Sequence, residues 1–134
     1  PCAVEEFLRH QNTVVYLRRT ATRDMEYIGQ QIRKGDKLVC ILGAPNRDPA
    51  LFPDPDAFDI TRPINNTRKS YRTFGQGPHY CVGVHQARLN LEVMLEEIVG
   101  RMTGFRLLAA PRHARSIFME GYKEMRVAFA RRPA

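Results

Sequence analysis

The chain has 134 residues, enough for at most one domain of ordinary size. Its composition, 43% hydrophobic and 26% charged, is that of a soluble globular protein, and no apolar run approaches the roughly 20 residues of a membrane-spanning helix. The net charge of +7 favours an acidic partner. The basic residues are scattered and form no zinc-finger, helix-turn-helix or RNA-recognition pattern, so a nucleic-acid-binding module would rest on charge alone.

The first segment, residues 1–11, is predicted to be a helix because Val4, Phe7 and Leu8 can share one face. The chain opens on Pro1 in what reads as the middle of this helix. We therefore interpret the whole sequence as the C-terminal part of a single, larger domain.

Residues 13–42 are predicted to be a β region with three β-prone runs, at 14–17, 27–32 and 37–42. The last two runs are joined by residues 33–36, Arg-Lys-Gly-Asp, which is a turn signal. We expect these two runs to pair with each other as a hairpin.

Residues 45–80 carry little regular pattern and many prolines, so we expect an ordered stretch held by turns. A helix is predicted over residues 81–103, with Gly104 as its stop, followed by a β-ribbon at 115–130 around Gly121. The apolar stripe expected to bury this helix is Ala87, Leu91, Met94, Leu95, Ile98 and Met102. The predicted fold class is mainly α with small β-sheets, an α+β arrangement.

Three cysteines, Cys2, Cys40 and Cys81, are too few for a disulfide framework, which fits a reducing cytosol. Cys2 and Cys40 are predicted to fill the core. Cys81 differs because it lies in the glycine-rich run FGQGPHYCVG, residues 74–83, directly ahead of the predicted helix. A thiolate there gains from the partial positive charge of a helix start, and a soft thiolate suits iron held in a haem. The alternative is a buried structural cysteine.

The run at residues 74–83 resembles the haem-binding signature of the cytochrome P-450 family. That signature is Phe, Gly, any, Gly, any, His, any, Cys, any, Gly. All six fixed positions are matched, by Phe74, Gly75, Gly77, His79, Cys81 and Gly83. The histidine is the residue that soluble bacterial members usually carry, so the chain resembles a bacterial, soluble member.

Further segments resemble the same family in the same order. Glu6 and Arg9 match its ExxR motif, and Arg62, in FPDPDAFDITRP, matches the arginine that joins this pair in a buried ion network. Arg19 begins a segment resembling the RxAxxD stretch, whose arginine contacts a haem propionate, and residues 46–49 read Asn-Arg-Asp-Pro as in the meander. Without the resemblance, Glu6 and Arg9 would be a surface pair and Arg19 a charge at a strand edge.

The resemblance implies a haem b (iron protoporphyrin IX) monooxygenase that inserts one oxygen atom of dioxygen into an organic, apolar substrate. Cys81 would be the axial iron ligand, His79 and Arg19 would bind propionates, and Phe74 would pack near the sulfur. Gly75, Gly77 and Gly83 would shape the loop around the haem. Substrate contacts would come from two segments, represented by Val14, Val15, Tyr16 and Phe118.

The resemblance also implies an electron donor, most simply an acidic ferredoxin. It would dock on basic residues around the cysteine loop, namely Arg68, Lys69, Arg72, His85 and Arg88. We expect a cytoplasmic monomer without a membrane segment and without nucleic acid.

The sequence departs from the family pattern at Tyr71, where bacterial members often have His, and at Val82, Gln86 and Asn90. The family's central helix, with its acid–alcohol pair for proton delivery, has no counterpart in these residues. We therefore expect the isolated 134 residues to be inactive. The alternatives are a haem-binding but catalytically incomplete fragment and a peroxide-driven hydroxylase.

Overall fold

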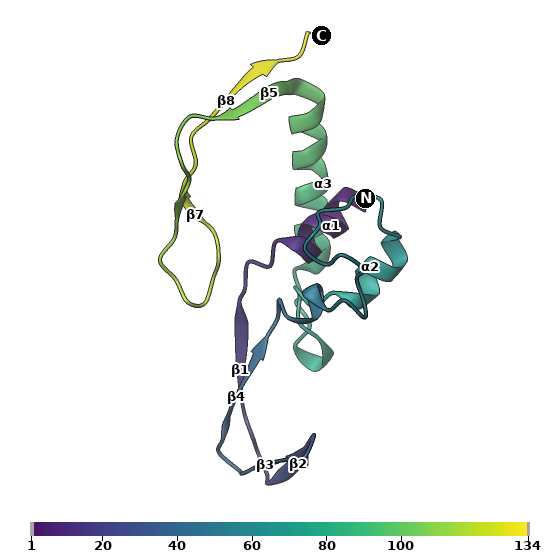
Figure 1. The fold of residues 1–134 in the computed structure, drawn as a ribbon, viewed down its shortest axis with the longest axis vertical. Coiled ribbons are helices and arrows are strands. Elements are labelled where there is room, and N and C mark those ends of the chain that lie inside the picture. Colours follow the sequence, from purple (N-terminus) through teal and green to yellow (C-terminus); the bar gives the residue numbers. More distant parts are fainter. Residues whose placement is uncertain (1, 134) are drawn as a thin grey trace.

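The computed structural model describes residues 2–133, and Pro1 and Ala134 lie outside the described part. A helical centre carries two β-ribbons: one extends downwards from it, and the other leaves the far end of α3 and turns back beside that helix towards the first ribbon (Figure 1). The three α-helices of the centre are α1 (Cys2–His10), α2 (Ile64–Ser70) and α3 (Val84–Arg101). Helix α1 packs against both others. The buried side chains between them are Val4, Leu8, Phe52 and Tyr71, with Phe74, Leu91 and Leu95 packed against this core.

Helix α1 ends where side chains from distant segments take over its last carbonyl groups. A helix leaves four terminal carbonyls without a partner inside the helix. Here Thr73 Oγ1 donates to Leu8 O over 2.5 Å, and Asn46 Nδ2 donates to Arg9 O over 3.2 Å. The next carbonyl, of His10, accepts from an arginine side chain over 3.1 Å. The end of α1 is therefore fixed to the segment that leads into the cysteine loop.

The first ribbon is a pair of nested hairpins. Its outer strands are β1 (Tyr16–Thr20) and β4 (Lys37–Ile41), which pair antiparallel. Its inner strands are β2 (Met25–Tyr27) and β3 (Gln30–Ile32). The expected hairpin between 27–32 and 37–42 is wrong.

The reason is a tight turn inside the run 27–32. Ile28 and Gly29 have φ values of 49° and 73°, and Tyr27 pairs with Gln30 across them. Two consecutive central residues with positive φ make the turn type that matches strand twist in two-residue hairpins. The predicted strand is therefore folded back on itself at its first residues.

The stretch between the first ribbon and the cysteine loop contains two short helices, the single 3₁₀ turn η1 (Pro45–Arg47) and helix α2. The loop itself contains the 3₁₀ turn η2 (Gly77–His79). Helix α2 was not predicted, because its sequence INNTRKS shows no apolar periodicity. It is held instead by ionic contacts to α1, described below.

Helix α3 is shorter than the predicted 81–103, and Gly104 is not its stop. The chain passes directly into strand β5 (Met102–Leu107), where Gly104 has a φ of 63° beside a shift in strand register. Strand β5 pairs with β8 (Val127–Arg131) and encloses the smaller pair β6 (Arg112–His113) and β7 (Tyr122–Glu124). The ribbon expected at 115–130 is therefore wider and starts at the end of α3.

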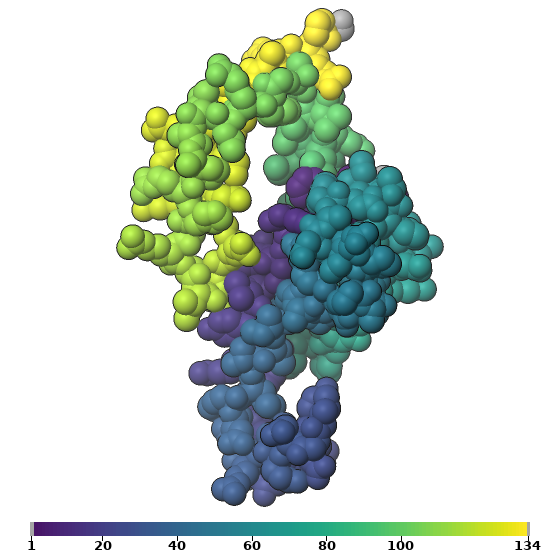
Figure 2. Space-filling model, in the orientation of Figure 1, coloured from purple at the N-terminus to yellow at the C-terminus, as the bar shows by residue number. Residues whose placement is uncertain are grey.

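Much apolar surface is exposed on the described residues. Met94, predicted to be buried, is 56% exposed. Several other apolar side chains on α3 and on the second ribbon are exposed as well. Cys2 and Cys40 are also exposed, so their prediction as core residues is wrong. The space-filling view shows open space between α3 and the second ribbon (Figure 2). Within residues 2–133, none of the helices has the length and apolar character needed to cross a membrane.

Candidate functional site

The cysteine loop is a turn closed at both ends by backbone hydrogen bonds. Cys81 N donates to Phe74 O over 3.0 Å, and Gly75 N donates to Arg72 O over 2.8 Å. Gly75 and Gly77 have φ values of 74° and 73°, a region that side chains disfavour. Glycine at these two positions therefore lets the chain bring Cys81 back beside Phe74 without backbone strain.

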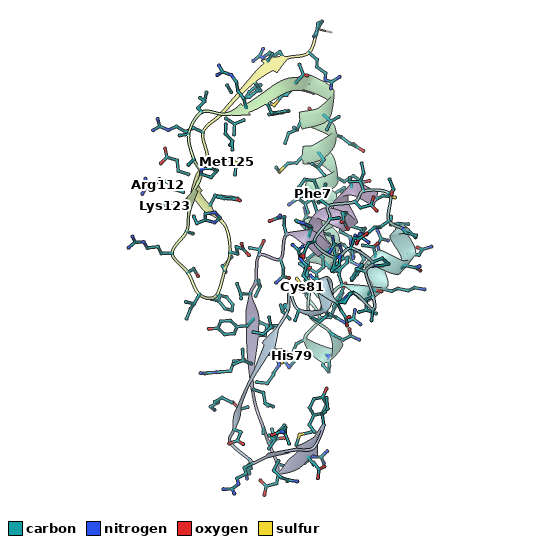
Figure 3. All side chains as sticks on the ribbon, in the orientation of Figure 1. Phe7, His79, Cys81, Arg112, Lys123 and Met125 are labelled. Carbon is teal, nitrogen blue, oxygen red and sulfur yellow. The ribbon has the colours of Figure 1, made fainter. Side chains whose placement is uncertain are left out.

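Cys81 lies on the wall of an apolar hollow between the first ribbon and the start of α3 (Figure 3). The hollow has a volume of about 470 Å³. The ribbon lines one side with Val14, Leu17 and Leu42, and the loop supplies Phe74, His79 and Cys81, while Ala87 and Leu91 come from α3. Cys81 and His79 are exposed in this hollow rather than packed away. The structural alternative of a buried Cys81 is therefore not what the fold contains.

A second hollow of about 270 Å³ adjoins the first and carries cationic side chains. The two share Leu17, Leu42 and Gly75, and the second is also lined by Arg19 and Arg72. An apolar space with a thiol on one wall, an imidazole nearby and guanidinium groups at its margin fits a flat, apolar cofactor that carries carboxylates. The residues present therefore fit a haem.

Gly83 has an ordinary φ of −84°, so its backbone does not require glycine. A Cβ atom built at this position would lie 3.8 Å from Cys81 Sγ. A side chain at this position would therefore sit against the sulfur. Glycine keeps that side of Cys81 clear.

The Arg9 guanidinium is completely buried and uses all five of its N–H donors. Two bonds go to the Glu6 carboxylate, over 2.7 and 2.6 Å. The other three go to the carbonyl oxygens of Asn46, Pro55 and Ala57, over 2.9, 2.7 and 2.8 Å. Arg9 therefore joins α1 to two parts of the stretch between the first ribbon and α2.

Arg62 joins the same site more weakly. Its Nε lies 3.4 Å from Glu6 Oε1, while its two terminal nitrogens donate to Pro53 O and Asp54 O, each over 2.8 Å. Burial acts to raise the pKa of Glu6. The hydrogen bonds from Arg9 and from the Asp59 backbone N–H, together with the charges of both guanidiniums, outweigh burial and hold that pKa below its usual range. The structure thus brings the three residues of the predicted network together, with Arg62 at its edge.

A second buried carboxylate, Glu5, was not predicted. It is 1% exposed, and its Oε1 accepts from Arg68 Nη2 over 2.7 Å and from Arg88 Nε over 2.9 Å. Its Oε2 accepts from the Tyr71 hydroxyl over 2.7 Å. The available signal was helical geometry, because Glu5 lies three residues before Leu8 and therefore shares its buried face.

These contacts change the ionisation of the cluster. Burial acts to raise the pKa of Glu5, but the hydrogen bonds from Arg68 and Tyr71 and the charge of Arg88 outweigh it and lower that pKa. Burial and the bond to Glu5 raise the pKa of Tyr71. Arg88 was expected on a docking surface, but it is only 15% exposed and bound to this carboxylate, so that expectation is wrong.

The predicted substrate-contact residues meet where the two ribbons touch. Val15 N donates to Phe118 O over 3.0 Å, and the rings of Tyr16 and Phe118 lie edge to face at 5.8 Å. Val14 forms an isolated bridge with Met119. Of the four, only Val14 lines the hollow that contains Cys81.

A thiol in a glycine-rich loop, facing an apolar hollow and followed by a long helix, is the arrangement that a thiolate-ligated haem protein needs. The chain belongs to the cytochrome P-450 family, whose profile matches residues 2–121. This confirms the predicted family and haem b as the family's cofactor.

Two of the related proteins are named as bacterial monooxygenases. The chain is 41% identical over 125 residues to linalool 8-monooxygenase of Pseudomonas putida, covering 93% of this chain and 30% of that protein. It is 45% identical over 106 residues to 20-oxo-5-O-mycaminosyltylactone 23-monooxygenase of Streptomyces fradiae, covering 79% and 24%.

A solved structure confirms the fold class. CYP153D17 of Sphingomonas sp. PAMC 26605 matches with a TM-score of 0.87 and 39% identity, over 98% of this chain and 32% of that one. The chain thus spans about a third or less of the length of the relatives it matches.

Proposed function

We propose that this chain is the thiolate-donating part of a haem-dependent monooxygenase that inserts one oxygen atom of dioxygen into an apolar organic substrate. The observation that carries the proposal is Cys81 itself, exposed on the wall of an apolar hollow of about 470 Å³ within a loop that has the family signature. The monooxygenase names of the relatives support the same activity.

The side chains around the hollow would divide the work. Bound haem would supply the iron at which dioxygen is activated. Cys81 would hold that iron as a thiolate, His79 and Arg19 would donate to the propionates, and Phe74 would limit the access of water to the sulfur. Val14 would contact the substrate.

The substrate is proposed only as a class, a small apolar molecule. The two relatives are named for different substrates, linalool and 20-oxo-5-O-mycaminosyltylactone, so similarity over this region does not select between them. Val15, Tyr16 and Phe118 would act at the junction of the two ribbons, next to the hollow rather than in its wall.

The electron donor is proposed to be an acidic, ferredoxin-type protein, and the enzyme a cytoplasmic monomer. Exposed Lys69 and His85 and half-exposed Arg68 flank the loop, and would attract acidic side chains. Such attraction weakens with salt, so reduction by a ferredoxin should slow as ionic strength rises. A rate that is independent of salt would contradict this docking surface.

The test is the absorption of the reduced carbon monoxide complex, in protein expressed from the complete reading frame that encodes this chain. A thiolate ligand gives a strongly red-shifted Soret band, and Cys81→Ser should abolish it because a hydroxyl is a hard, weak donor. Cys2→Ser is the matched control, since that thiol is also exposed but lies at the start of α1 and lines neither hollow. Retention of the band in Cys81→Ser would refute the proposal.

Two further arms separate the alternatives. Product formation with dioxygen and a reductant supports the monooxygenase, whereas product formed only with hydrogen peroxide supports a peroxide-driven hydroxylase. A red-shifted band without product in either arm supports a haem-binding, catalytically incomplete protein. The isolated 134 residues are expected to be inactive, so turnover by residues 1–134 alone would contradict that part of the proposal.

A further inference from the structure

Glu5, which is not one of the motif residues Glu6, Arg9 and Arg62, is the centre of a second cluster. Its carboxylate accepts five contacts from three side chains, which come from α2, from the residue after α2, and from α3. Arg68 donates over 2.9 and 2.7 Å, Arg88 lies at 2.9 and 3.4 Å, and Tyr71 donates over 2.7 Å. Glu5 therefore holds three elements of the helical centre at one point.

Arg88 extends this cluster towards the cysteine loop. Its Cζ lies 5.4 Å from the centre of the Phe74 ring, a cation–π contact. Arg88 Nη2 also donates to the Tyr71 hydroxyl over 2.8 Å, and the Tyr71 ring lies 6.3 Å from that of Phe74. Two neighbours of Phe74 are thus both held by Glu5.

Phe74 connects the cluster to the thiol. Its carbonyl accepts the Cys81 N–H over 3.0 Å, and its ring lines the same hollow as Cys81. A continuous series of contacts therefore runs from Glu5 through Arg88 and Phe74 to Cys81. A ring that shifts beside a metal-bound sulfur changes the solvent access and the dielectric around it.

We propose that Glu5 is a positioning residue that fixes Phe74 beside Cys81 through Arg88 and Tyr71, and thereby sets the reduction potential of the bound iron. The inference rests on the proposed role of Cys81 as the iron ligand. Arg88 is suited to this task because a planar guanidinium can bind a carboxylate with its edge while it lies over an aromatic face. The charge of the cluster also acts on the reduction potential, since the single carboxylate of Glu5 faces two guanidiniums.

The first test is Glu5→Gln in the haem-loaded protein from the complete reading frame, with the reduction potential as the readout. The change removes a negative charge, which favours uptake of an electron, and it also loosens Arg88 and with it the position of Phe74. We expect the equilibrium constant for reduction to rise about tenfold, a shift of ~59 mV towards positive potential for one electron. Glu96→Gln makes the same charge change at an exposed position of α3 and should leave the potential unchanged.

The second test keeps the charge and changes only the shape. Arg88→Lys retains a cation beside Glu5 but loses the planar group over Phe74, so it should also shift the potential. Arg101→Lys is its control, because that arginine lies on the same helix and is 75% exposed. If Glu5→Gln fails to hold haem, Arg88→Lys decides the question alone, and a potential equal to that of the control overturns the proposal.

A double-mutant cycle separates positioning from general stabilisation. If Glu5 acts through Arg88, Glu5→Gln should shift the potential less in the Arg88→Lys background than in the unchanged protein. Fully additive shifts, or a Glu5→Gln potential equal to that of Glu96→Gln, would overturn the proposal. If instead the proposed function is wrong, the unchanged protein itself will lack the red-shifted carbon monoxide band.

Discussion

The side-chain amide of Asn46 donates to the hydroxyl of Thr73 over 2.8 Å, across 27 positions of the chain. Asn46 is 1% exposed, and its Oδ1 accepts the backbone N–H of Arg72 over 2.6 Å. The Thr73 hydroxyl in turn donates to Leu8 O. One amide side chain therefore fixes the entrance of the cysteine loop to the end of α1.

Asn46→Ala should therefore misplace the loop as well as destabilise the fold. It leaves the buried carbonyl of Arg9 and the part-buried N–H of Arg72 without these partners, at a cost of up to about 1–3 kcal/mol for each unsatisfied group. We expect reduced haem content together with a lower free energy of unfolding in urea. Gln30→Ala, on the exposed strand β3, is the control and should change neither. Normal haem content in Asn46→Ala would contradict this prediction.

Arg9→Ala should be more damaging than Arg62→Ala. Removing Arg9 leaves the buried Glu6 carboxylate without its two short bonds, and the loss of one partner of a buried pair costs about 3–5 kcal/mol. Arg62 contacts Glu6 only at 3.4 Å and bonds mainly to carbonyl groups that lie near solvent. Urea unfolding should therefore rank the two variants.

Two outcomes of that experiment bear on the network. The double variant should be less destabilised than the sum of the single changes, because both arginines share Glu6. Equal destabilisation by the two single changes would mean that Arg62 is as deeply involved as Arg9. Arg101→Ala, 75% exposed, gives the baseline for losing a surface arginine.

The motif residues were the part of the site that the sequence could predict. Arg62 lies more than fifty positions after Glu6 and Arg9, yet a family pattern names all three, and they meet in the fold. The same pattern could not identify Glu5, because a motif names only its fixed positions. Helical geometry would have placed Glu5 beside Leu8, but an acidic residue there reads as a solvent-facing charge unless its partners are known.

The strand pairing was less predictable. The turn at Ile28 and Gly29 lacks the Asn-Gly or Asp-Gly pair that usually marks such hairpins, whereas residues 33–36 contain a stronger turn signal. The stronger local signal led to the wrong partner for strand β4. Its true partner, β1, is set by contacts over a longer distance in the chain.

The two buried carboxylates should make the fold sensitive to acid. The folded-state pKa values of Glu5 and Glu6 lie below the usual value, so the unfolded chain binds protons first as the pH falls. Their contribution to stability is complete above the unfolded pKa of about 4.3 and is lost as the pH falls through the folded values. The free energy of unfolding should therefore decline steeply at acid pH.

Glu5→Gln tests the origin of that decline. The variant should be less stable than the unchanged protein at neutral pH, but its stability should fall less on acidification. Glu97→Gln, where the carboxylate is 53% exposed, should keep the steep decline. The measurement is a series of urea titrations between neutral and acid pH, and identical pH slopes for Glu5→Gln and the unchanged protein would contradict the assignment.

The glycines of the cysteine loop should separate effects on the backbone from effects on the iron site. Gly77 has a φ of 73° with no atom within 4 Å of an added Cβ, so Gly77→Ala meets no clash and should cost only the ~1–2 kcal/mol of the left-handed conformation. Gly83→Ala meets no such strain, because its φ is −84°. Its new methyl group, however, would lie 3.8 Å from Cys81 Sγ. We therefore expect Gly77→Ala to lower the free energy of unfolding. Gly83→Ala should leave that free energy within about 0.5 kcal/mol of the unchanged protein. Instead, Gly83→Ala should shift the Soret band or lower the haem content. A Gly83→Ala protein with an unchanged Soret band and full haem content would show that this side of the sulfur does not face the cofactor.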